Sequence, residues 1–362
     1  MNLFKKAEDY SVELGLPSLF VGKDGKTIET AADWEENRDY YKKMLEHFMY
    51  GDIPTGDFDV SGEIIFSEKV YDGKAVHEFV KISFKRGGYA KKLSFVAEIT
   101  RPNKSGRFYT FCYVAFPNAR NYEVEEECVC KRNYVIALFN YEQLAPDDNT
   151  KNTEIYSMFT DLDVNAVGLW AFCMMRLADF LDQQDYAVSG KYIATGHSRN
   201  GKAALCAGIF DDRFFITAPN NSGCGGCGCF RFLGGKDGQT QDSSAVETLE
   251  VITGYFTNWF SKNLNEFYDK EERSNGVFNA KLPFDLHLNK ALIAPKILIS
   301  LEAWDDSWAN PYGSGLTHEA AKKVFEMFGV KENIEIQYRD GKHAFQTSDW
   351  FKLLDFCDKK LK

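Results

Sequence analysis

The sequence lacks any run of about 18 apolar residues, so no membrane-spanning helix is expected. It also lacks a long basic tract, and its formal net charge is -10. That charge argues against nucleic acid or an anionic membrane surface as a partner. Residues 1–17 carry two lysines but no apolar segment of a secretory signal, which favours a cytoplasmic protein.

The cysteines form neither an even set nor a complete metal site. There are nine, so at least one stays unpaired within the chain, and this also favours a reducing, cytoplasmic setting. Cys224 and Cys227 form a C-x-x-C pair with Cys229 close behind, but a structural zinc needs four ligands. No second C-x-x-C or nearby histidine completes the set, so we expect no metal and no organic cofactor.

The hydrophobic pattern changes near residue 100. Residues 59–100 alternate between apolar and polar, with turn signals at 72–73 and 87–88, which predicts antiparallel strands. Beyond them, continuous apolar runs typical of strands buried on both faces alternate with helical segments, including a long amphipathic helix at 164–181. The runs are 108–116, 134–141, 191–196, 215–220 and 296–302. We therefore expect one α/β domain over 1–362, with an antiparallel N-terminal part (1–100) and a doubly wound, mostly parallel core (101–362).

One short motif points to chemistry. Residues 196–201 read GHSRNG, close to the G-x-S-x-G nucleophile elbow, although the second glycine comes one residue late. The motif has meaning only between a strand and a helix, and here the strand 191–196 precedes it and a helical segment follows. The pattern predicts an α/β-hydrolase fold with Ser198 as a nucleophile, which needs a base to take its proton.

In this fold the chain order is serine, acid, histidine. Three histidines follow Ser198. His287 could be structural, and His318 begins the predicted helix 318–328, where we expect it to be exposed. His343 lies between the strand 334–339 and the final helix, in the loop where the base belongs, so we favour it.

The acid should follow the strand 296–302. That strand leads into Asp305 and Asp306, at the carboxyl end where ligands bind in open α/β sheets. Either carboxylate could hold the imidazole in the required tautomer, and the spacing does not choose between them.

The elbow GHSRNGKAAL resembles the glucuronoyl esterase family, carbohydrate esterase family 15, and its bacterial relatives often labelled acetyl-xylan esterases. The shared pattern is G-x-S-R-x-G-K-x-A, with Arg199 and Lys202 both in register. The segments NNSGCGG, LPFDLHLNKALIAPKILI, DSW and KHAF also resemble the family, so the likeness extends from about residue 35 to the C-terminus.

The resemblance implies roles position by position. Ser198 would be the nucleophile and His343 the base. The backbone N–H of Arg199 would lie in the oxyanion hole, and its guanidinium would add charge stabilisation. Lys202 would donate to sugar hydroxyls, and Trp308 would face the sugar ring.

Two positions depart from the family. Many members carry the catalytic Glu where this chain has Asn221, and relatives often have Trp where it has Phe230. We expect both residues in the substrate site, with the acid supplied by the DDSW loop. There Asp306 is the better match to the bacterial x-D-x-W pattern, and Asp305 is the alternative. These departures weaken the expectation of methyl glucuronoyl ester cleavage but leave esterase activity intact.

We therefore predict a serine carboxylesterase that acts on acetylated or otherwise esterified plant carbohydrate through an acyl-enzyme, with a small-molecule or oligosaccharide ester as its substrate. A glucuronoyl methylesterase is the alternative within the enzyme class. A catalytically silent saccharide-binding member of the fold is the alternative outside it. The aromatic cluster 254–260 could line a sugar cleft or cap the core. The sequence leaves the oligomeric state open.

Overall fold

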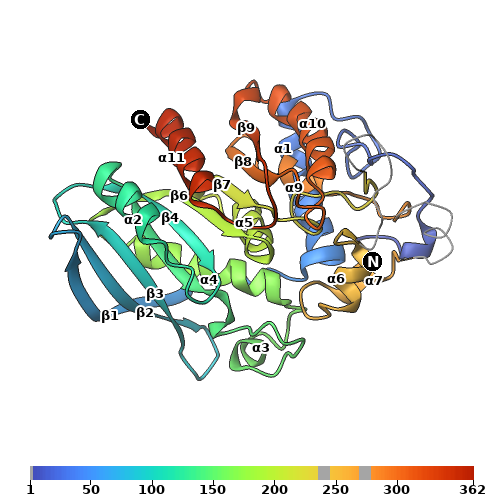
Figure 1. The fold of residues 1–362 in the computed structure, drawn as a ribbon. Helices are drawn as coiled ribbons and strands as arrows, with labels where there is room; N and C mark the ends of the chain where they lie inside the picture. Colours follow the sequence, from blue (N-terminus) through green and yellow to red (C-terminus); the bar gives the residue numbers. More distant parts are fainter. Residues whose placement is uncertain (1–2, 235–244, 269–278) are drawn as a thin grey trace.

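A nine-stranded sheet forms the centre of the computed structural model, which describes residues 3–234, 245–268 and 279–362. The strand order is β1-β2-β3-β5-β4-β6-β7-β8-β9 (Figure 1). The strands are β1 (Phe58–Val70), β2 (Ala75–Arg86), β3 (Leu93–Pro102), β4 (Phe108–Ala115), β5 (Val135–Asn140), β6 (Ala187–His197), β7 (Phe214–Asn220), β8 (Ile297–Ala303) and β9 (Ile334–Arg339).

The sheet changes direction where the sequence pattern changes. β1, β2 and β3 pair antiparallel, and β3 joins β5 antiparallel. From β5 onward every neighbouring pair is parallel. The predicted α/β architecture, a mostly parallel sheet with an antiparallel N-terminal part, is confirmed.

Helices precede β1, fill the connections between the parallel strands and follow β9. They are α1 (Ala31–Leu45), α2 (Tyr122–Glu125), α3 (Glu154–Met158), α4 (Ala166–Leu181), α5 (Arg199–Phe210), α6 (Leu249–Gly254), α7 (Lys262–Asn265), α9 (His287–Ala291), α10 (Pro311–Met327) and α11 (Thr347–Leu361). The π-helical turns η2 (Glu46–Tyr50) and η3 (Glu126–Lys131) continue α1 and α2, and the 3-10 turns are η1 (Ala7–Asp9), η4 (Tyr141–Gln143) and η6 (Lys331–Asn333). In the described part of the chain, none of these helices combines the length and apolar character that crossing a bilayer requires.

Alternating side chains of the strands build two cores. In β4, Cys112 and Val114 belong to one buried cluster, together with residues of α4 and α5. Phe111 and Tyr113 belong to the other, together with residues of α11. Because successive side chains of a strand point to opposite faces, the sheet lies between two helical layers. The carboxyl ends of its parallel strands are left to form a site.

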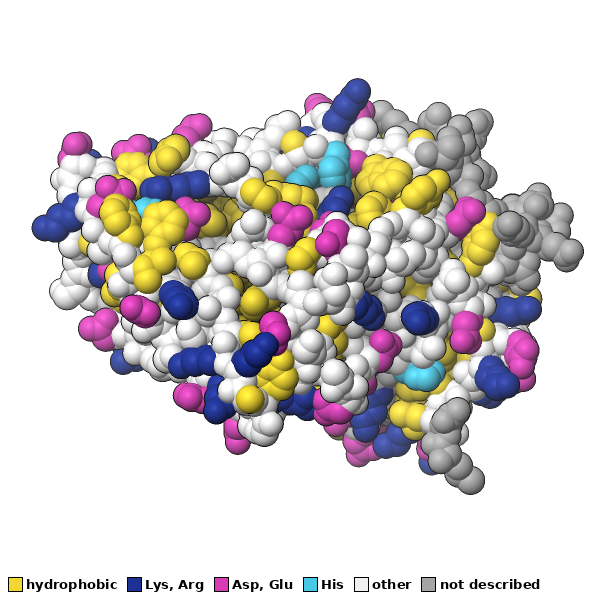
Figure 2. All heavy atoms as spheres, turned by 90° about the horizontal axis from the view of Figure 1, so that it is seen from below, with side chains coloured by type: hydrophobic (Ala, Val, Ile, Leu, Met, Phe, Trp, Pro, Cys, Tyr) yellow, Lys and Arg dark blue, Asp and Glu magenta, His cyan; other side chains and the backbone are white. Residues whose placement is uncertain are grey.

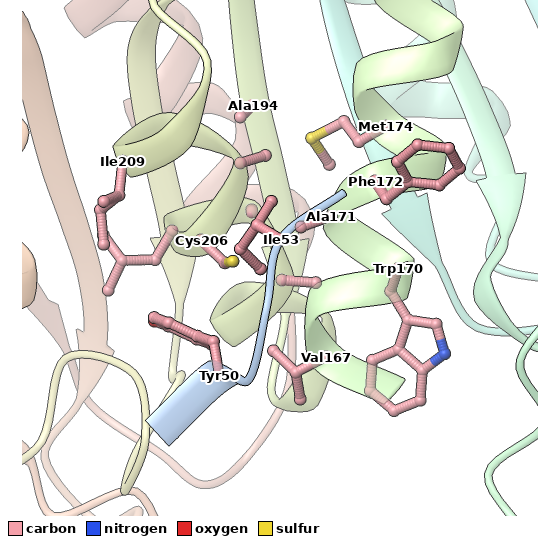
Figure 3. Close-up of a cluster of buried hydrophobic side chains, with 14 of the residues drawn as sticks. Tyr50, Ile53, Val167, Trp170, Ala171, Phe172, Met174, Ala194, Cys206 and Ile209 are labelled. Atoms are coloured by element: carbon pink, nitrogen blue, oxygen red, sulfur yellow. The ribbon is translucent and has the colours of Figure 1, made fainter. Parts of the chain in front are cut away.

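The long helix α4 differs from its prediction. It was expected to be amphipathic, but all of its residues except Asp179 are buried. The reason is that α4 is covered on more than one side, because β1 curls over it and places Phe58 against Phe172, with ring centroids 5.0 Å apart. Figure 3 shows Val167, Ala171 and Met174 of α4 on the side that faces Ala194 of β6 and Cys206 of α5, whereas Trp170 and Phe172 point to the other side of the helix.

The prediction for His318 was wrong. The helix α10 begins at Pro311, seven residues before His318, with the Asn310 side chain accepting from Gly313 N as its cap. His318 therefore lies inside the helix and is buried. Burial lowers its pKa to about 3, so its imidazole is neutral at physiological pH.

Candidate active site

The predicted elbow is present at the end of β6. Ser198 has φ 58° and ψ −127° between the last residue of β6 and the first of α5. This is strained backbone for a residue other than glycine. A Cβ on Gly196 would lie 2.3 Å from Asn200 O, so the turn is too tight for any side chain there. The strain and the close approach hold the Ser198 side chain at the tip of the turn.

The loop after β9 carries His343, and it faces the loop after β8. The His343 Nδ1 lies 2.6 Å from Asp306 Oδ2, with the carboxylate as acceptor. The Asp306 side chain is 2% exposed, whereas that of His343 is 32% exposed. With Nδ1 carrying the proton toward Asp306, Nε2 of His343 is left as a proton acceptor.

The two adjacent aspartates have different partners. Asp305 is exposed, and its Oδ2 accepts a hydrogen bond of 2.9 Å from Gly341 N. A second bond runs from Asp305 N to Gly341 O at 3.1 Å. Asp305 therefore ties the two loops together through the backbone, and Asp306 is the carboxylate on the imidazole.

His197 joins the elbow to the histidine loop. Its ring centroid lies 4.5 Å from that of His343, and its Nδ1 lies 2.6 Å from Asn220 Oδ1. Burial, with a smaller contribution from neighbouring His343, lowers the pKa of His197 to about 4. Since His197 directly precedes Ser198, these contacts bring the serine segment beside His343, although the two are 145 positions apart in the chain.

Arg339 holds the loop that carries His343, here called the histidine loop, through hydrogen bonds to its backbone. Its Nε binds both carboxylate oxygens of Asp349 at 2.9 Å. Its Nη2 donates to Lys342 O at 3.0 Å and to Ala344 O at 2.5 Å, the carbonyls on either side of His343. Sequence reasoning missed this anchor, for which no local motif exists.

Arg199 follows the nucleophile and points toward a second loop. Its Nη1 pairs with Asp147, and its guanidinium carbon lies 4.8 Å from the ring centroid of Trp259. Asp147 was not predicted, although it follows the strand β5 at the edge of the sheet where ligands bind. Trp259 comes from the aromatic cluster 254–260, so that cluster contacts the candidate site and is also buried against the core.

Lys202 is not a solvated helix lysine. It is 1% exposed, and its Nζ donates to Glu247 Oε2 at 2.7 Å and to Ser222 O at 2.8 Å. Glu247 N in turn donates to Trp308 O at 3.0 Å. Trp308 is 36% exposed. Glu247 escaped sequence reasoning because it lies 45 positions from Lys202 in a stretch without a motif.

Two expected substrate contacts are buried. Phe230 is 1% exposed and packs edge-on against Phe284 at 6.2 Å, so burial gives no support for a sugar contact there. Asn221 is also 1% exposed, and its Nδ2 donates to Ala344 O at 3.2 Å. Its Oδ1 is buried without a partner among the described residues. Asn221 thus contacts the histidine loop through the backbone beside His343.

The remaining histidine after the elbow is structural in its contacts. His287 is buried in α9, and its Nε2 lies 2.8 Å from Pro17 O. The three clustered cysteines, Cys224, Cys227 and Cys229, are buried as free thiols. In the described ranges, no three His, Cys, Asp or Glu side chains gather as a metal site would require. Figure 2 shows a patch of histidine side chains in the upper middle of the face seen from below, with apolar, acidic and basic side chains around it.

A strained serine between a parallel strand and a helix, on a doubly wound sheet, defines an α/β hydrolase. Comparison with known proteins narrows the class. The family model for glucuronyl esterase from fungi matches residues 83–329, which is more than half of the chain. The chain therefore belongs to the glucuronoyl esterase family, carbohydrate esterase family 15, and it is a carboxylic ester hydrolase.

Individual relatives agree with this family. A 4-O-methyl-glucuronoyl methylesterase of Schizophyllum commune is 30% identical over 325 residues, covering 88% of this chain and 75% of the relative. Carbohydrate esterase MZ0003, from an unknown prokaryotic organism, is 25% identical and covers 95% of this chain and 89% of its own length. A solved glucuronoyl esterase from Caldicellulosiruptor kristjansonii has a TM-score of 0.81 at 28% identity, covering 97% of this chain and 91% of that one.

Proposed function

We propose that this protein is a glucuronoyl esterase that cleaves the ester on the carboxyl group of a glucuronic acid residue, with Ser198, His343 and Asp306 as its catalytic triad. The observation that carries the proposed chemistry is the Asp306–His343 pair beside the strained serine turn. The proposed substrate rests on relatives, since the Schizophyllum commune protein is named a 4-O-methyl-glucuronoyl methylesterase.

The proposed reaction has two halves. Ser198 Oγ attacks the ester carbonyl carbon while His343 Nε2 takes the hydroxyl proton. The C–O bond to the alcohol then breaks, and His343 returns the proton to the departing alkoxide, leaving an acyl-enzyme. Water loses a proton to His343 as its oxygen attacks the acyl carbon, the bond from that carbon to Ser198 Oγ breaks, and His343 returns the proton to Oγ, which releases the acid and restores Ser198. Asp306 stabilises the imidazolium in both halves, and the N–H groups near Arg199 stabilise the oxyanion.

We assign sugar recognition to the Lys202–Glu247 pair and to Trp308. The Lys202 and Glu247 side chains are 1% and 4% exposed and pair with each other at 2.7 Å, so their contact with the hydroxyls of a pyranose rests on the family resemblance and not on exposure. Trp308 is partly exposed, and its backbone carbonyl accepts from Glu247 N, so its chain segment adjoins that of Glu247. Aromatic faces favour the apolar side of a sugar ring.

Deacetylation of xylan is the second candidate, because Asn221 and Phe230 depart from the family's usual residues. The relatives reported above give it no support by name. The two reactions place the reacting carbonyl differently, on the sugar in a glucuronate ester and on the acetyl group in acetyl xylan. A silent saccharide-binding protein is a third outcome of the same tests.

The test is a substrate panel of methyl glucuronate esters, acetylated xylo-oligosaccharides and aryl acetates. The proposal expects the highest kcat/KM on the methyl glucuronate ester and its loss in Ser198→Ala. Asp306→Asn should lower kcat by about 10⁴-fold, as a wrongly held imidazole does in a serine triad. Preference for acetylated sugars would favour the second candidate. A wild-type chain that cleaves nothing and whose Ser198 does not react with a fluorophosphonate would be a silent binder.

We also propose that the protein works in a reducing compartment such as the cytoplasm. All nine cysteines lie in the described part of the chain, and each carries a free thiol. The test is to denature the protein as isolated, without a reductant, and to count its reactive thiols. Nine thiols would support the proposal, and a count lowered by disulfides would contradict it.

A further inference from the structure

Asp147 and Trp259 hold the Arg199 guanidinium from outside the elbow. The Asp147 side chain is 4% exposed and lies in the loop after β5 and η4. It pairs with Arg199 Nη1, and its Oδ1 accepts a hydrogen bond of 2.6 Å from Trp259 Nε1. The buried Asp147 carboxylate thus binds two side chains that are distant in the chain. Arg199 is 52 residues away and Trp259 is 112 residues away, and the carboxylate holds them side by side.

Two stacked aromatic rings lie beside the same guanidinium. Trp259 and Phe256 stack at 3.9 Å with an interplanar angle of 7°. The guanidinium carbon of Arg199 lies 4.8 Å from the first ring and 5.4 Å from the second. Lys202 Nζ lies 5.4 Å from the Trp259 ring as well. Trp259 therefore contacts the cations of both Arg199 and Lys202, near the start of α5.

Helix α4 supports both halves of this arrangement. Trp170 is fully buried, and its Nε1 donates to Ala145 O at 2.8 Å, in the loop that carries Asp147. Its ring also meets the Trp259 ring edge-on, at a centroid distance of 6.3 Å. Figure 3 shows Trp170 on α4, within the buried cluster. The loop and the tryptophan thus rest on the same side chain of the core.

Arg199 keeps donor capacity after these contacts. Its Nη1 binds Asp147, the Tyr141 hydroxyl is a second hydrogen-bonding neighbour, and its Nε is buried without a partner among the described residues. A guanidinium that is flat, charged and fixed at one nitrogen can offer its remaining N–H groups without first losing side-chain freedom. Donors that are oriented before the reaction are what an oxyanion requires.

We propose that Asp147, together with Trp259, is a positioning residue that holds Arg199 in the orientation in which it stabilises the oxyanion on the substrate of Ser198. The inference rests on the proposed esterase function. Asp147 does not touch the reacting atoms, and it acts only through Arg199. Its negative charge opposes the charge of Arg199, so a purely electrostatic role would make its removal beneficial, whereas a positioning role makes its removal harmful.

The first test is Asp147→Asn, which keeps the shape and removes the charge. We expect kcat on the preferred ester to fall about 10- to 100-fold while KM stays within about threefold, as expected when an oriented group is lost. Trp259→Phe keeps an aromatic face and loses the Nε1 donor, so it should cause a smaller fall in kcat. If Asp147→Asn does not fold, as judged by its thermal unfolding, the Trp259→Phe result decides.

A matched control distinguishes positioning from a general loss of stability. Asp211 also pairs with an arginine, Arg213 Nη2 at 2.6 Å, with 12% of its side chain exposed. It caps the far end of α5, about 18 Å along the helix from Ser198. Asp211→Asn should lower thermal stability and leave kcat unchanged.

Two further measurements identify Arg199 as the intermediary. In an Arg199→Gln background, Asp147→Asn should cause no additional fall in kcat. The inhibition constant of phenylboronic acid, which forms a negatively charged tetrahedral adduct on a serine, should rise by the same factor by which kcat falls. A labelling rate of Ser198 by a fluorophosphonate should fall in parallel.

Three results overturn the inference. They are an unchanged or higher kcat in Asp147→Asn, a fall in kcat that persists in full in the Arg199→Gln background, and an unchanged boronate affinity beside a lower kcat. The proposed function fails separately, when the wild-type chain cleaves no ester of the panel, and the inference then fails with it. A wild-type chain that is active beside an equally active Asp147→Asn variant removes the inference alone.

Discussion

Two arginines of the candidate site, Arg339 and Arg199, use their guanidinium groups in different ways. Arg339 is 9% exposed, and all three of its nitrogens bind the protein, through Asp349 and through the carbonyls of Asp340, Lys342 and Ala344. Arg199 binds Asp147 through Nη1, its Nε is buried without a partner among the described residues, and its guanidinium carbon lies beside the stacked rings of Trp259 and Phe256. A guanidinium whose three nitrogens all bind the protein orients the backbone, whereas one with fewer protein partners keeps N–H groups for a ligand. The difference separates a group that builds the site from a group that acts in it.

The largest effect should come from replacing Arg339, all of whose guanidinium nitrogens bind the protein. Arg339→Gln leaves the buried Asp349 carboxylate without its partner, and losing one member of a buried pair costs about 3–5 kcal/mol of unfolding free energy. Chemical denaturation measures the loss. Arg86→Gln is the control, because its pair with Asp161 is 27% and 60% exposed and should contribute under about 1 kcal/mol. Equal losses in the two variants would contradict the structural role of Arg339.

The next effect concerns catalysis. Arg199→Gln should lower kcat by about 10²- to 10³-fold, the usual cost of removing an oxyanion donor. It also leaves the Asp147 carboxylate, 4% exposed, without its charge partner, so the unfolding free energy should fall as well. That fall should be smaller than in Arg339→Gln, because Arg199 is 27% exposed and Asp147 keeps its hydrogen bond from Trp259 Nε1. Steady-state kinetics and denaturation of the same preparation measure both. If stability falls as far as in Arg339→Gln while kcat holds, the two arginines play the same role and the comparison fails.

A smaller effect is expected at His197, which lies between the serine turn that carries Arg199 and the histidine loop that Arg339 holds. Its folded pKa, about 4, lies below the unfolded value of 6.5, so the neutral ring stabilises the fold above pH 6.5 and that contribution is lost as the pH falls toward 4. Between pH 6.5 and 5 the loss is up to about 2 kcal/mol. Denaturation at the two pH values should show a smaller loss in His197→Gln. An unchanged pH dependence would place the acid sensitivity elsewhere.

The smallest effect should come from Asp305→Asn. The amide still accepts from Gly341 N and no buried charge is left behind, so kcat should stay within about threefold and stability within about 0.5 kcal/mol. Kinetic assays alongside Asp306→Asn provide the contrast. If kcat fell as far in Asp305→Asn as in Asp306→Asn, the assignment of Asp306 alone as the triad acid would be wrong.

The sheet and the serine turn were predictable because their signals are local. Alternation and continuous apolar runs reflect burial of one or both faces of a strand, and the motif around Ser198 reflects the space available in one tight turn. The order of Ser198, Asp306 and His343 follows from the direction of parallel strands. The start of α10 also had a local signal, Asn310 before Pro311, which was overlooked in favour of the apolar period.

The supporting groups were not predictable from local patterns. Asp147, Glu247 and Arg339 have partners that lie far away in the chain or bind backbone carbonyls, and neither kind of partner leaves a periodic trace in sequence. The burial of α4 was missed for a related reason. Its second cover is β1, a strand more than 90 residues earlier, so a helix that is apolar nearly all round was taken for a one-sided one.

The place of β9 in the strand order has a consequence for how activity is lost. Among the described strands β9 is terminal, since it pairs only with β8, while β6 has paired neighbours on both sides. The nucleophile is thus delivered from the interior of the sheet and the base from its rim. Edge strands of a sheet exchange and unfold locally before the central strands do. Amide exchange should therefore be faster in β9 than in β6, and hydrolysis should cease at a denaturant concentration that leaves most of the circular dichroism intact.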